Sequence, residues 1–417
     1  MKKILAELIT IGDEILYGQT LDTNAHWMSG QLDAIGVKVV RRTTCGDQEE
    51  EILQVFAEAE QRADLVLITG GLGPTSDDLT KPCLARYFDS EIVMNQQALA
   101  ELEAYMTSRG RELNKLTRLQ AALPDKCEVV SNDRGTACGM WFNRNGKVFV
   151  SMPGVPHEMR YMMVEKVMPR IQRAFDLPII YHKIIRLAGI GESWLAEKIE
   201  QWEKSLPKTV KLAYLPGYGD LKLRLTSLAS DLELQKKEID QLVSSLMPLI
   251  QEYVYGYDDD SLEVVIGRLL KEKGLTLALA ESCTGGYVAH RITSVAGSSA
   301  YFNGAMVPYQ NELKIAQLGV KEATIVTYGA VSEETVSEMA LNIAQKFGAD
   351  YGLASSGIAG PGGGTEEKPI GLIWIACAIG GKVTTRKLNL TKDRDVNIKL
   401  TAVALFTLLH QSLVAND

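Results

Sequence analysis

The chain has 417 residues, of which 46% are hydrophobic and 23% are charged, a composition typical of a soluble globular protein of two to four domains. Its formal net charge is −8 and it has no run of lysines or arginines, which argues against a nucleic-acid-binding surface. No uninterrupted apolar stretch approaches the roughly 20 residues of a membrane span, so we expect neither nucleic acid nor a membrane as a partner.

The first 175 residues alternate strand-like and helix-like segments. Strands are predicted at 3–10, 37–44 and 64–71, and helices at 23–36 and 49–63. Parallel strands joined by crossover helices explain this order with the shortest connections. An Asn-Gly turn within residues 138–152 predicts a hairpin, and a helix at 155–175 closes this first domain.

The pattern changes after residue 175. Strands are predicted at 179–189, 210–216 and 220–228, and helices at 192–204 and 232–250. This small α+β unit, residues 176–257, has no cluster of catalytic residue types, and we interpret it as a spacer or dimerisation domain. The acidic turn YDDDS precedes a third domain, residues 258–417, in which strands and helices again alternate.

A glycine-rich loop follows the strand that ends near residue 69, in the sequence LITGGLGPTSDD. Gly70, Gly71 and Gly73 can adopt positive φ and bring backbone N–H groups close to a phosphate or pyrophosphate. The loop is neither a P-loop nor a G-x-G-x-x-G motif, because the residues that define those motifs are missing.

Carboxylates stand beside this loop. Asp77 and Asp78 repel a phosphate unless a divalent cation such as Mg²⁺ bridges the two, and Asp47 can add a third carboxylate from a neighbouring strand end. We therefore predict these aspartates as metal ligands. The alternative is that Asp77 or Asp78 only caps the next helix.

The segment AESCTGG, residues 280–286, places three nucleophilic side chains at a strand-to-helix turn. Ser282 lies where the strand ends, so its hydroxyl can project into a cleft, and we predict it as the nucleophile. Cys283 would point elsewhere, and Thr284 is placed to cap the helix that starts at Gly285 and Gly286. The alternative is that Ser282 only caps a helix or binds phosphate.

No histidine is placed to activate this serine, since His290 lies farther along the same helix. Lys314 begins a later helix, and a lysine can act as a base if burial lowers its pKa. Tyr309 precedes it at a predicted strand end and would relay the proton or orient the base. By itself such a lysine is more often a solvated surface residue, and only the resemblance described below favours catalysis.

A second glycine-rich stretch, ASSGIAGPGGG, follows the strand DYGLA. Ser355 and Ser356, with Gly357 and Gly360, could hold a phosphate or supply oxyanion donors, unless this is a loop without a ligand. Arg394 is a candidate partner for the phosphate, or alternatively part of an ion pair with its neighbouring aspartates.

The scattered cysteines and histidines suggest where the protein works. The six cysteines have no C-x-x-C spacing and the five histidines form no H-E-x-x-H motif. Unpaired thiols in a chain of this length are typical of the cytoplasm, which we expect as the location. A zinc site is not expected.

Three segments of the first domain, ITIGDEILYGQTLDTNAHWMSGQL, GGLGPTSDDLTKPCLA and MPGVPHEM, resemble the N-terminal domain of the CinA family (competence/damage-inducible protein A). That domain resembles molybdopterin-binding domains and is associated with metal-dependent ADP-ribose pyrophosphatase activity. The resemblance implies that Asp47 and Asp78 lie near the metal, with Glu14 at the neighbouring strand end. It also implies a phosphate loop made by Gly70, Gly71, Gly73 and Thr75.

The last domain resembles the other half of the same family, the nicotinamide mononucleotide (NMN) deamidase domain that also occurs as stand-alone PncC proteins. The matching segments are LALAESCTGG, VAGSSAYFNGAMVPYQNELKIAQLGV, YGAVSEETVSEMA, SSGIAGPGGGTEEKPIGLIW and KDRD. Because both resemblances occur in family order, they are stronger evidence than any one motif.

We therefore expect an α/β protein with a molybdopterin-binding-like domain (1–175), a small α+β domain (176–257) and an α/β amidohydrolase domain (258–417). Ser282, Lys314 and Tyr309 would be catalytic, with substrate bound by Gly285, Gly286, Ser356, Gly357, Gly360 and Arg394.

The expected activities are hydrolysis of the NMN carboxamide and cleavage of ADP-ribose, in a cytoplasmic homodimer that recycles pyridine nucleotides. The second activity requires a divalent metal (Mg, Mn or Co), whereas the deamidase needs no cofactor. The alternatives are a nucleotide- or pterin-binding protein without turnover, and a partner protein in competence or DNA damage.

Overall fold

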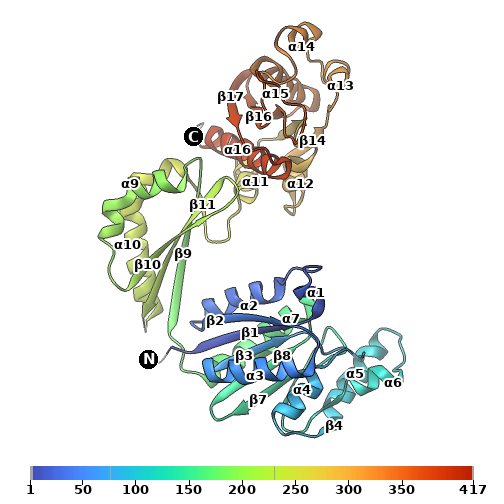
Figure 1. Ribbon diagram of the computed structural model, residues 1–417. Helices are drawn as coiled ribbons and strands as arrows, with labels where there is room; N and C mark the ends of the chain where they lie inside the picture. The colour runs from blue at the N-terminus through green and yellow to red at the C-terminus, as the bar shows by residue number, and fades with distance from the viewer. Residues whose placement is uncertain (1–2, 76, 230, 416–417) are drawn as a thin grey trace. The chain divides into compact units, whose positions relative to one another are not determined.

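The computed structural model describes residues 3–75, 77–229 and 231–415. They form two compact units, one of Met1–Tyr181 with Leu228–Gln235 and the other of His182–Ser227 with Lys236–Asp417. Figure 1 shows the first unit mainly in blue and cyan and the second from green to red.

The first unit contains a six-stranded sheet in the order β2-β1-β3-β8-β7-β6. Its strands are β1 (Leu5–Ile11), β2 (Lys38–Cys45), β3 (Leu65–Thr69), β6 (Glu128–Val130), β7 (Gly139–Arg144) and β8 (Lys147–Met152). The first four strands of the sheet, β2, β1, β3 and β8, are parallel, as the alternating pattern predicts, and β7 and β8 form the predicted hairpin. Asn145 and Gly146 at its turn both have positive φ.

Helices cover both faces of this sheet (Figure 1). Alternate residues of β1 point to opposite faces, so Leu8 packs with α2 (Thr23–Ala34) and α7 (Pro156–Met162), whereas Ile9 packs with α3 (Glu49–Arg62). The remaining elements are α1 (Asp13–Leu16), α4 (Thr80–Tyr87), β4 (Ile92–Met94), α5 (Gln96–Ser108), α6 (Lys115–Leu119) and β5 (Ala122–Pro124).

The helix predicted at 155–175 has an irregular middle. A π-helical turn, Met163–Val167, separates α7 from α8 (Met168–Ala174). Pro169 lies at the start of α8 and has no N–H to donate to the preceding turn. The break therefore has a local cause that periodicity alone does not reveal.

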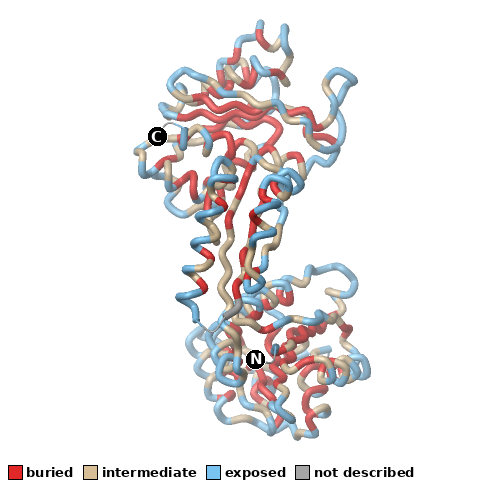
Figure 2. The backbone as a smooth tube through the Cα atoms, turned by 90° about the vertical axis from the view of Figure 1, so that its left-hand side faces the viewer, coloured by how far each residue is buried: buried red, intermediate tan, exposed pale blue. Residues whose placement is uncertain are grey.

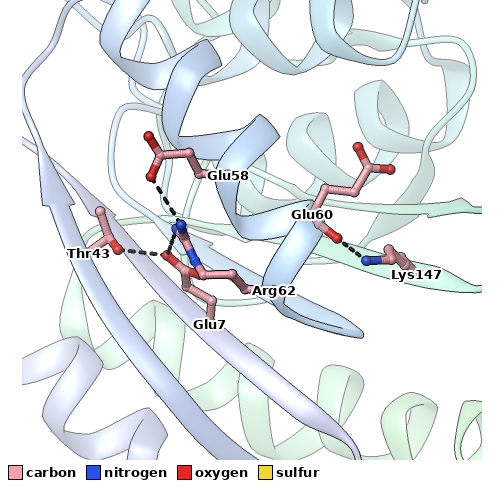
Figure 3. A network of polar contacts seen from close by, with 6 residues as sticks. All are labelled: Glu7, Thr43, Glu58, Glu60, Arg62 and Lys147. Carbon is pink, nitrogen blue, oxygen red and sulfur yellow. Dashed lines mark hydrogen bonds and ion pairs between the residues drawn. The ribbon is translucent and has the colours of Figure 1, made fainter.

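One strand of the first sheet carries a buried carboxylate. Glu7 in β1 is fully buried, and Figure 3 shows its contacts with Thr43 and Arg62. The Thr43 hydroxyl donates to Oε1 at 2.7 Å, and Arg62 donates to both carboxylate oxygens at 3.0 Å. Burial of this charge is tolerated because a cation and a hydroxyl satisfy it.

The second unit begins with a four-stranded sheet in the order β10-β11-β9-β12. Its elements are β9 (Ile179–Ala188), α9 (Glu192–Lys204), β10 (Val210–Pro216), β11 (Asp220–Ala229), α10 (Leu232–Ile250), a 3₁₀ turn (Gln251–Tyr253) and β12 (Val254–Tyr257). The sequence predicts all of the longer elements but not β12, which has only four residues and lies in the acidic boundary region.

The remainder of this unit is built on a five-stranded sheet, β14-β13-β15-β16-β17. Its strands are β13 (Leu277–Glu281), β14 (Phe302–Met306), β15 (Tyr351–Gly357), β16 (Leu372–Ile379) and β17 (Lys382–Asn389). The helices are α11 (Leu262–Lys273), α12 (Tyr287–Thr293), a 3₁₀ turn (Ser298–Ala300), α13 (Asn311–Ala316), α14 (Glu322–Tyr328), α15 (Glu333–Phe347) and α16 (Arg394–Ala415). Figure 2 shows the strands of this sheet as the buried centre of the domain.

Residues of α11, α12 and α16 pack on one face of this sheet and residues of α15 on the other. Among the described residues, α16 is one helix long and apolar enough to cross a membrane by length and composition, and half of that stretch is buried inside the protein. Phe406 and Leu409 of α16 are fully buried in this core, which is typical of a core helix. The six cysteines are free thiols.

Candidate functional site

The carboxyl ends of three parallel strands meet at one edge of the last sheet. β13 leads directly to Ser282, β15 ends at Gly357, and β14 is followed by the turn that contains Tyr309. In open α/β sheets, ligands bind outside the carboxyl ends of the strands. This edge is therefore where a site is expected.

Ser282 extends β13 by one residue. Its N–H donates to the Ser355 carbonyl at 3.0 Å, and its own carbonyl accepts from the Gly285 N–H at 3.2 Å. The residue is 8% exposed, and among the described residues no partner binds its hydroxyl. The backbone of Ser282 is thus fixed while its hydroxyl remains available.

Glu281 caps the helix that follows. Its Oε2 accepts from the N–H groups of Gly286 at 3.0 Å and Val288 at 3.1 Å, and its Oε1 accepts from Ala289 at 2.7 Å. The amides of Gly285 and Gly286 both donate within the turn, so their predicted contact with a substrate stays a prediction that these two N–H groups do not support. Positive φ angles of 60° and 97° explain why glycine stands at both positions.

Thr284 does not cap α12, contrary to the sequence prediction. Its hydroxyl forms a 2.8 Å hydrogen bond with the Ser355 hydroxyl, and both residues are buried. The helix begins at Tyr287, too far along the chain for Thr284 to act as its cap. Thr284 therefore joins two neighbouring strand ends.

Cys283 is buried, with 5% exposure. Burial raises the pKa of its thiol to about 12, although a hydrogen bond with Ser355 acts in the opposite direction. A thiol must ionise to act as a nucleophile, and Cys283 stays protonated at neutral pH. This favours the prediction that it acts as a small apolar side chain.

Lys314 has the properties expected of a base rather than those of a surface lysine. It is only 2% exposed, and burial lowers the pKa of its ammonium group. Its Nζ donates to the carbonyls of Pro308 at 3.0 Å and Tyr309 at 3.2 Å. In the neutral amine these bonds use both hydrogens and leave the lone pair free to accept a proton.

Tyr309 and Arg394 are in direct contact. Tyr309 lies three residues beyond the end of β14 and is 53% exposed. Arg394 donates to the Tyr309 hydroxyl at 2.7 Å and to the Gly360 carbonyl at 2.8 Å. The alternative ion pair with neighbouring aspartates is wrong, since Asp395 pairs with Lys399 and the Asp393 carboxylate accepts from the Val396 N–H.

The second glycine-rich stretch is less available to a ligand than the sequence predicts. Ser356 is buried and donates to the Ala330 carbonyl at 2.6 Å. Gly357 pairs with Ile373 inside the sheet, where an added Cβ would lie 2.4 Å from the Ile373 side chain. Gly360 has a φ of 97° and supplies the carbonyl that orients Arg394.

The predicted residues thus fall into two groups. Hydrogen bonds connect Lys314, Tyr309, Arg394 and Gly360, and the strand ends connect Ser282 to Ser355. Among the described residues no hydrogen bond joins Ser282 to Lys314. Cys283, next to Ser282, is close enough to Lys314 for the two side chains to interact electrostatically.

The first glycine loop follows β3 in the other unit. Gly70 has a φ of 105°, and an added Cβ would lie 2.1 Å from the Ile11 carbonyl oxygen. Gly71 has a φ of 62°, and its Cβ would lie 2.3 Å from the Thr80 hydroxyl. Glycine is required at both positions, because a Cβ at position 70 would collide with the backbone of Ile11 and a Cβ at position 71 with the side chain of Thr80.

Asp78 binds the loop itself. Its Oδ1 accepts from the Gly73 N–H at 2.7 Å, and its Oδ2 accepts from the N–H of Thr75 at 2.9 Å and from the hydroxyl at 2.5 Å. It does not cap α4, which lacks a side-chain cap. The Gly73 and Thr75 amides are therefore occupied, as is that of Gly70, which donates to Met152.

Asp47 lies beside other carboxylates. Its Oδ2 accepts from the Asp13 N–H at 3.0 Å. Burial raises the pKa of Asp47, and the charges of Asp13, Glu14 and Asp77 act in the same direction. Asp77 is exposed, and a hydrogen bond from Thr75 lowers its pKa.

The predicted metal ligands do not form a metal site as they lie. Within residues 3–75, 77–229 and 231–415, no group of three or more His, Cys, Asp or Glu side chains could hold a metal ion. The Asp78 carboxylate accepts hydrogen bonds from its own loop instead. As they lie, Asp47 and the neighbouring carboxylates do not form a site for a resident metal, and their role toward a cation stays a prediction.

Sequence reasoning missed Glu281 and the side-chain role of Ser355. A carboxylate close before a helix is a signal for capping, but Thr284 is the nearer and more usual choice. Ser355 lies 71 residues from Thr284, so no local pattern indicates their bond.

Three family matches cover most of the chain. Residues 7–173 match the probable molybdopterin binding domain, residues 182–256 the damage-inducible protein CinA KH domain, and residues 259–413 the CinA C-terminal domain. The expected combination of two α/β domains and a smaller α+β domain is thereby confirmed, and the middle domain is of the KH type.

Relatives match along nearly their whole length. A CinA-like protein of Cytophaga hutchinsonii is 51% identical over 410 residues, which cover 98% of each chain. A CinA-like protein of Amoebophilus asiaticus is 44% identical over 410 residues, 98% of this chain and 99% of that one. A solved CinA superfamily protein of Klebsiella pneumoniae is 32% identical and covers 37% of this chain and 96% of its own, with a TM-score of 0.36. With three family domains in one order and relatives matched from end to end, the chain belongs to the CinA family.

Proposed function

We propose that the C-terminal domain hydrolyses the carboxamide of NMN to nicotinate mononucleotide and ammonia. The observation that carries this proposal is the buried Lys314, whose pKa is lowered by burial and whose neutral amine keeps its lone pair. A buried lysine at a strand-end site with a free serine hydroxyl suits nucleophilic amide hydrolysis.

In the proposed reaction, the Ser282 oxygen attacks the carboxamide carbon and its proton passes to Lys314. Collapse of the tetrahedral intermediate breaks the C–N bond, and the protonated lysine supplies the proton that lets ammonia leave. Water then attacks the acyl-serine ester, again with Lys314 as base, and releases nicotinate mononucleotide. Side chains alone perform these steps.

Arg394 is the proposed ligand of the substrate phosphate. It is exposed, and its guanidinium group is oriented by the Tyr309 hydroxyl and the Gly360 carbonyl. Guanidinium binds phosphate in a bidentate manner, so a preoriented arginine suits this task. Tyr309 then acts by orienting Arg394 and by offering its carbonyl to Lys314.

The test is release of ammonia from NMN by the full-length protein. Ser282→Ala should lose nearly all turnover, whereas Cys283→Ala should remain active because the native thiol is buried and protonated. Iodoacetamide should leave wild-type activity unchanged for the same reason. An active Ser282→Ala enzyme would end the assignment of the nucleophile.

A binding protein without turnover is the first rival, and the ammonia assay separates it from the enzyme. A nucleic-acid partner is the second, since KH domains clamp RNA through a G-x-x-G loop. Residues 182–256 contain no G-x-x-G sequence, and the chain has a net charge of −8. Both features favour the enzyme over a direct nucleic-acid binder.

For the N-terminal domain we propose hydrolysis of ADP-ribose, with the divalent cation arriving as part of the metal–pyrophosphate substrate. The supporting observation is the charge around Asp47, where three further carboxylates raise its pKa together with burial. A cation bound to the substrate would relieve this repulsion.

This second activity should need a divalent cation and should be abolished by a chelator. Asp47→Asn should weaken it, because a carboxylate that attracts the cation is lost, while NMN deamidation stays unchanged. Pyrophosphatase activity that survives chelation would contradict the role of the cation. We also propose a cytoplasmic homodimer, on the basis of the unpaired cysteines and of the middle domain as a dimerisation domain.

A further inference from the structure

We infer that Glu281 is a positioning residue for the deamidation: its carboxylate fixes the Ser282 turn and keeps the substrate phosphate away from the start of α12. This inference rests on the proposed function of the same site. It concerns a residue that would touch neither the substrate nor the reacting atoms.

The geometry shows how Glu281 holds the turn. The side chain is 1% exposed, and its oxygens accept three backbone N–H groups, from Gly286, Val288 and Ala289. These three hydrogen bonds therefore fix the backbone that follows Ser282. On the other side, the Ser282 N–H is bonded to Ser355.

The charge of Glu281 has a second effect. N–H groups at the start of a helix normally attract anions, and a phosphate is a natural ligand for them. Here a carboxylate already occupies these donors, so a second anion meets both filled donors and a like charge. The phosphate must then lie elsewhere, and Arg394 offers the opposite charge at the same strand-end edge.

This arrangement sets the orientation of the substrate. In this proposal Arg394 holds the phosphate, and the carboxamide is turned toward the Ser282 hydroxyl, which has no partner among the described residues. Glu281 would thus select one of two binding directions. Its removal should affect the rate of the chemical step more than the affinity for NMN.

The experiment compares Glu281→Gln with the matched control Glu7→Gln in the full-length protein. Glu7 is also a strand glutamate that is fully buried, but it lies in the first sheet (Figure 3). Glu281→Gln keeps the shape but presents an NH₂ group to one of the N–H donors. Loss of a charge-assisted contact of this kind predicts a fall in kcat of roughly 10- to 100-fold, with KM for NMN changed by less than about 2-fold.

Glu7→Gln should lower the melting temperature without changing kcat. In Glu281→Ala, added formate should restore several-fold activity, because a small carboxylate can return to the vacated N–H groups, whereas chloride should not. If Glu281→Gln keeps wild-type kcat, the positioning role is wrong. If Glu281→Gln and Glu281→Ala both fail to fold while Glu7→Gln folds, Glu281 is a purely structural residue and the inference is also wrong.

A second readout separates this inference from the proposed function. Phenylmethanesulfonyl fluoride forms a bond between its sulfur and the oxygen of an activated serine, with loss of fluoride and transfer of the proton to the base. Mass spectrometry should find Ser282 labelled in the wild type and labelled much more slowly in Glu281→Gln. If the wild type labels Ser282 but releases no ammonia from NMN, the proposed substrate is wrong, and the difference in labelling alone then decides whether Glu281 positions the Ser282 turn. Equal labelling of wild type and variant would overturn the role of Glu281.

Discussion

Lys314 is buried, and its amino group has two hydrogen bonds to backbone carbonyls in place of contacts with water. This environment determines whether the amine is charged. At 2% exposure the charged ammonium form loses solvation, and two neutral acceptors do not replace it. The protein therefore favours the neutral amine more than water does. A surface lysine in the same sequence position would remain protonated and could not accept a proton from a serine.

This difference predicts the pH dependence of the deamidase. The base must be neutral, so kcat/KM should fall as the pH drops through the pKa of Lys314, and the midpoint should lie below lysine's ordinary value of 10.5 because burial lowers it. Lys314→Arg should be inactive across the whole range, since guanidinium does not lose its proton. Steady-state kinetics from pH 6 to 10 measure both effects, and an active arginine variant would exclude Lys314 as the base.

At the scale of the element, the turn after β13 and the loop after β3 both use a carboxylate side chain to bind their backbone N–H groups. The amides that follow β13 are bound by Glu281, and amides of the loop that follows β3 are bound by Asp78. In each turn, glycines supply the positive φ angles and a carboxylate satisfies N–H groups that would otherwise be unpaired. In both turns the described N–H groups are therefore bound by the protein itself.

The hydroxyl pair behind the Ser282 turn provides a prediction about stability. Ser355 is fully buried and binds both Thr284 and Cys283, so Ser355→Ala should cost about 1–3 kcal/mol of unfolding free energy. Thr284→Val should cost less, because Ser355 keeps its second partner. The double variant should be little worse than Ser355→Ala alone, as denaturant titrations can show. Fully additive losses would mean that the two hydroxyls act independently.

The elements of this protein are easier to predict from sequence than their polar contacts. Apolar periodicity and turn residues locate the parallel strands of the first sheet and the hairpin at Asn145, because burial on each face depends on local spacing. The π-helical turn at Met163–Val167 and the short β12 leave no comparable pattern.

The site is predicted only in part. Ser282, Lys314 and Arg394 are recognisable from motifs, and the structure adds the burial of Lys314 and the contact between Arg394 and Tyr309. The roles of Glu281, Asp78 and Ser355 depend on which amide or hydroxyl lies opposite each side chain. Such pairings follow from the folded backbone and not from spacing along the chain.

At the scale of the whole molecule, the second unit joins the KH-type and CinA C-terminal segments. Ala188 and Tyr255 lie in the same apolar core as Leu262 and Phe406, so residues on both sides of the predicted boundary at 257–258 pack together. The strand-end site itself uses only residues after that boundary. Stability therefore depends on residues before and after the boundary, whereas the proposed catalysis depends only on residues after it.

We predict that fragments 182–417 and 258–417 both deamidate NMN, but that the shorter one is less stable. Loss of Tyr255, which is 6% exposed, should lower the unfolding free energy by roughly 2 kcal/mol, the scale for exposing one large side chain. Thermal melts and ammonia release measure the two properties. A folded but inactive shorter fragment would show that the site needs residues before 258.

Each of the two largest sheets has an outer strand that carries exposed, positively charged side chains. β2 is an outer strand of the first sheet and carries Lys38, Arg41 and Arg42, and β17 is an outer strand of the last sheet and carries Lys382 and Lys387, all of them exposed. Unpaired strand edges invite other strands to add to them, which leads to aggregation. Rows of like charge oppose such pairing between copies, and salt screens this repulsion. The protein should therefore stay dispersed at low ionic strength, and the edges should become prone to aggregation when these lysines and arginines are replaced by valine or threonine.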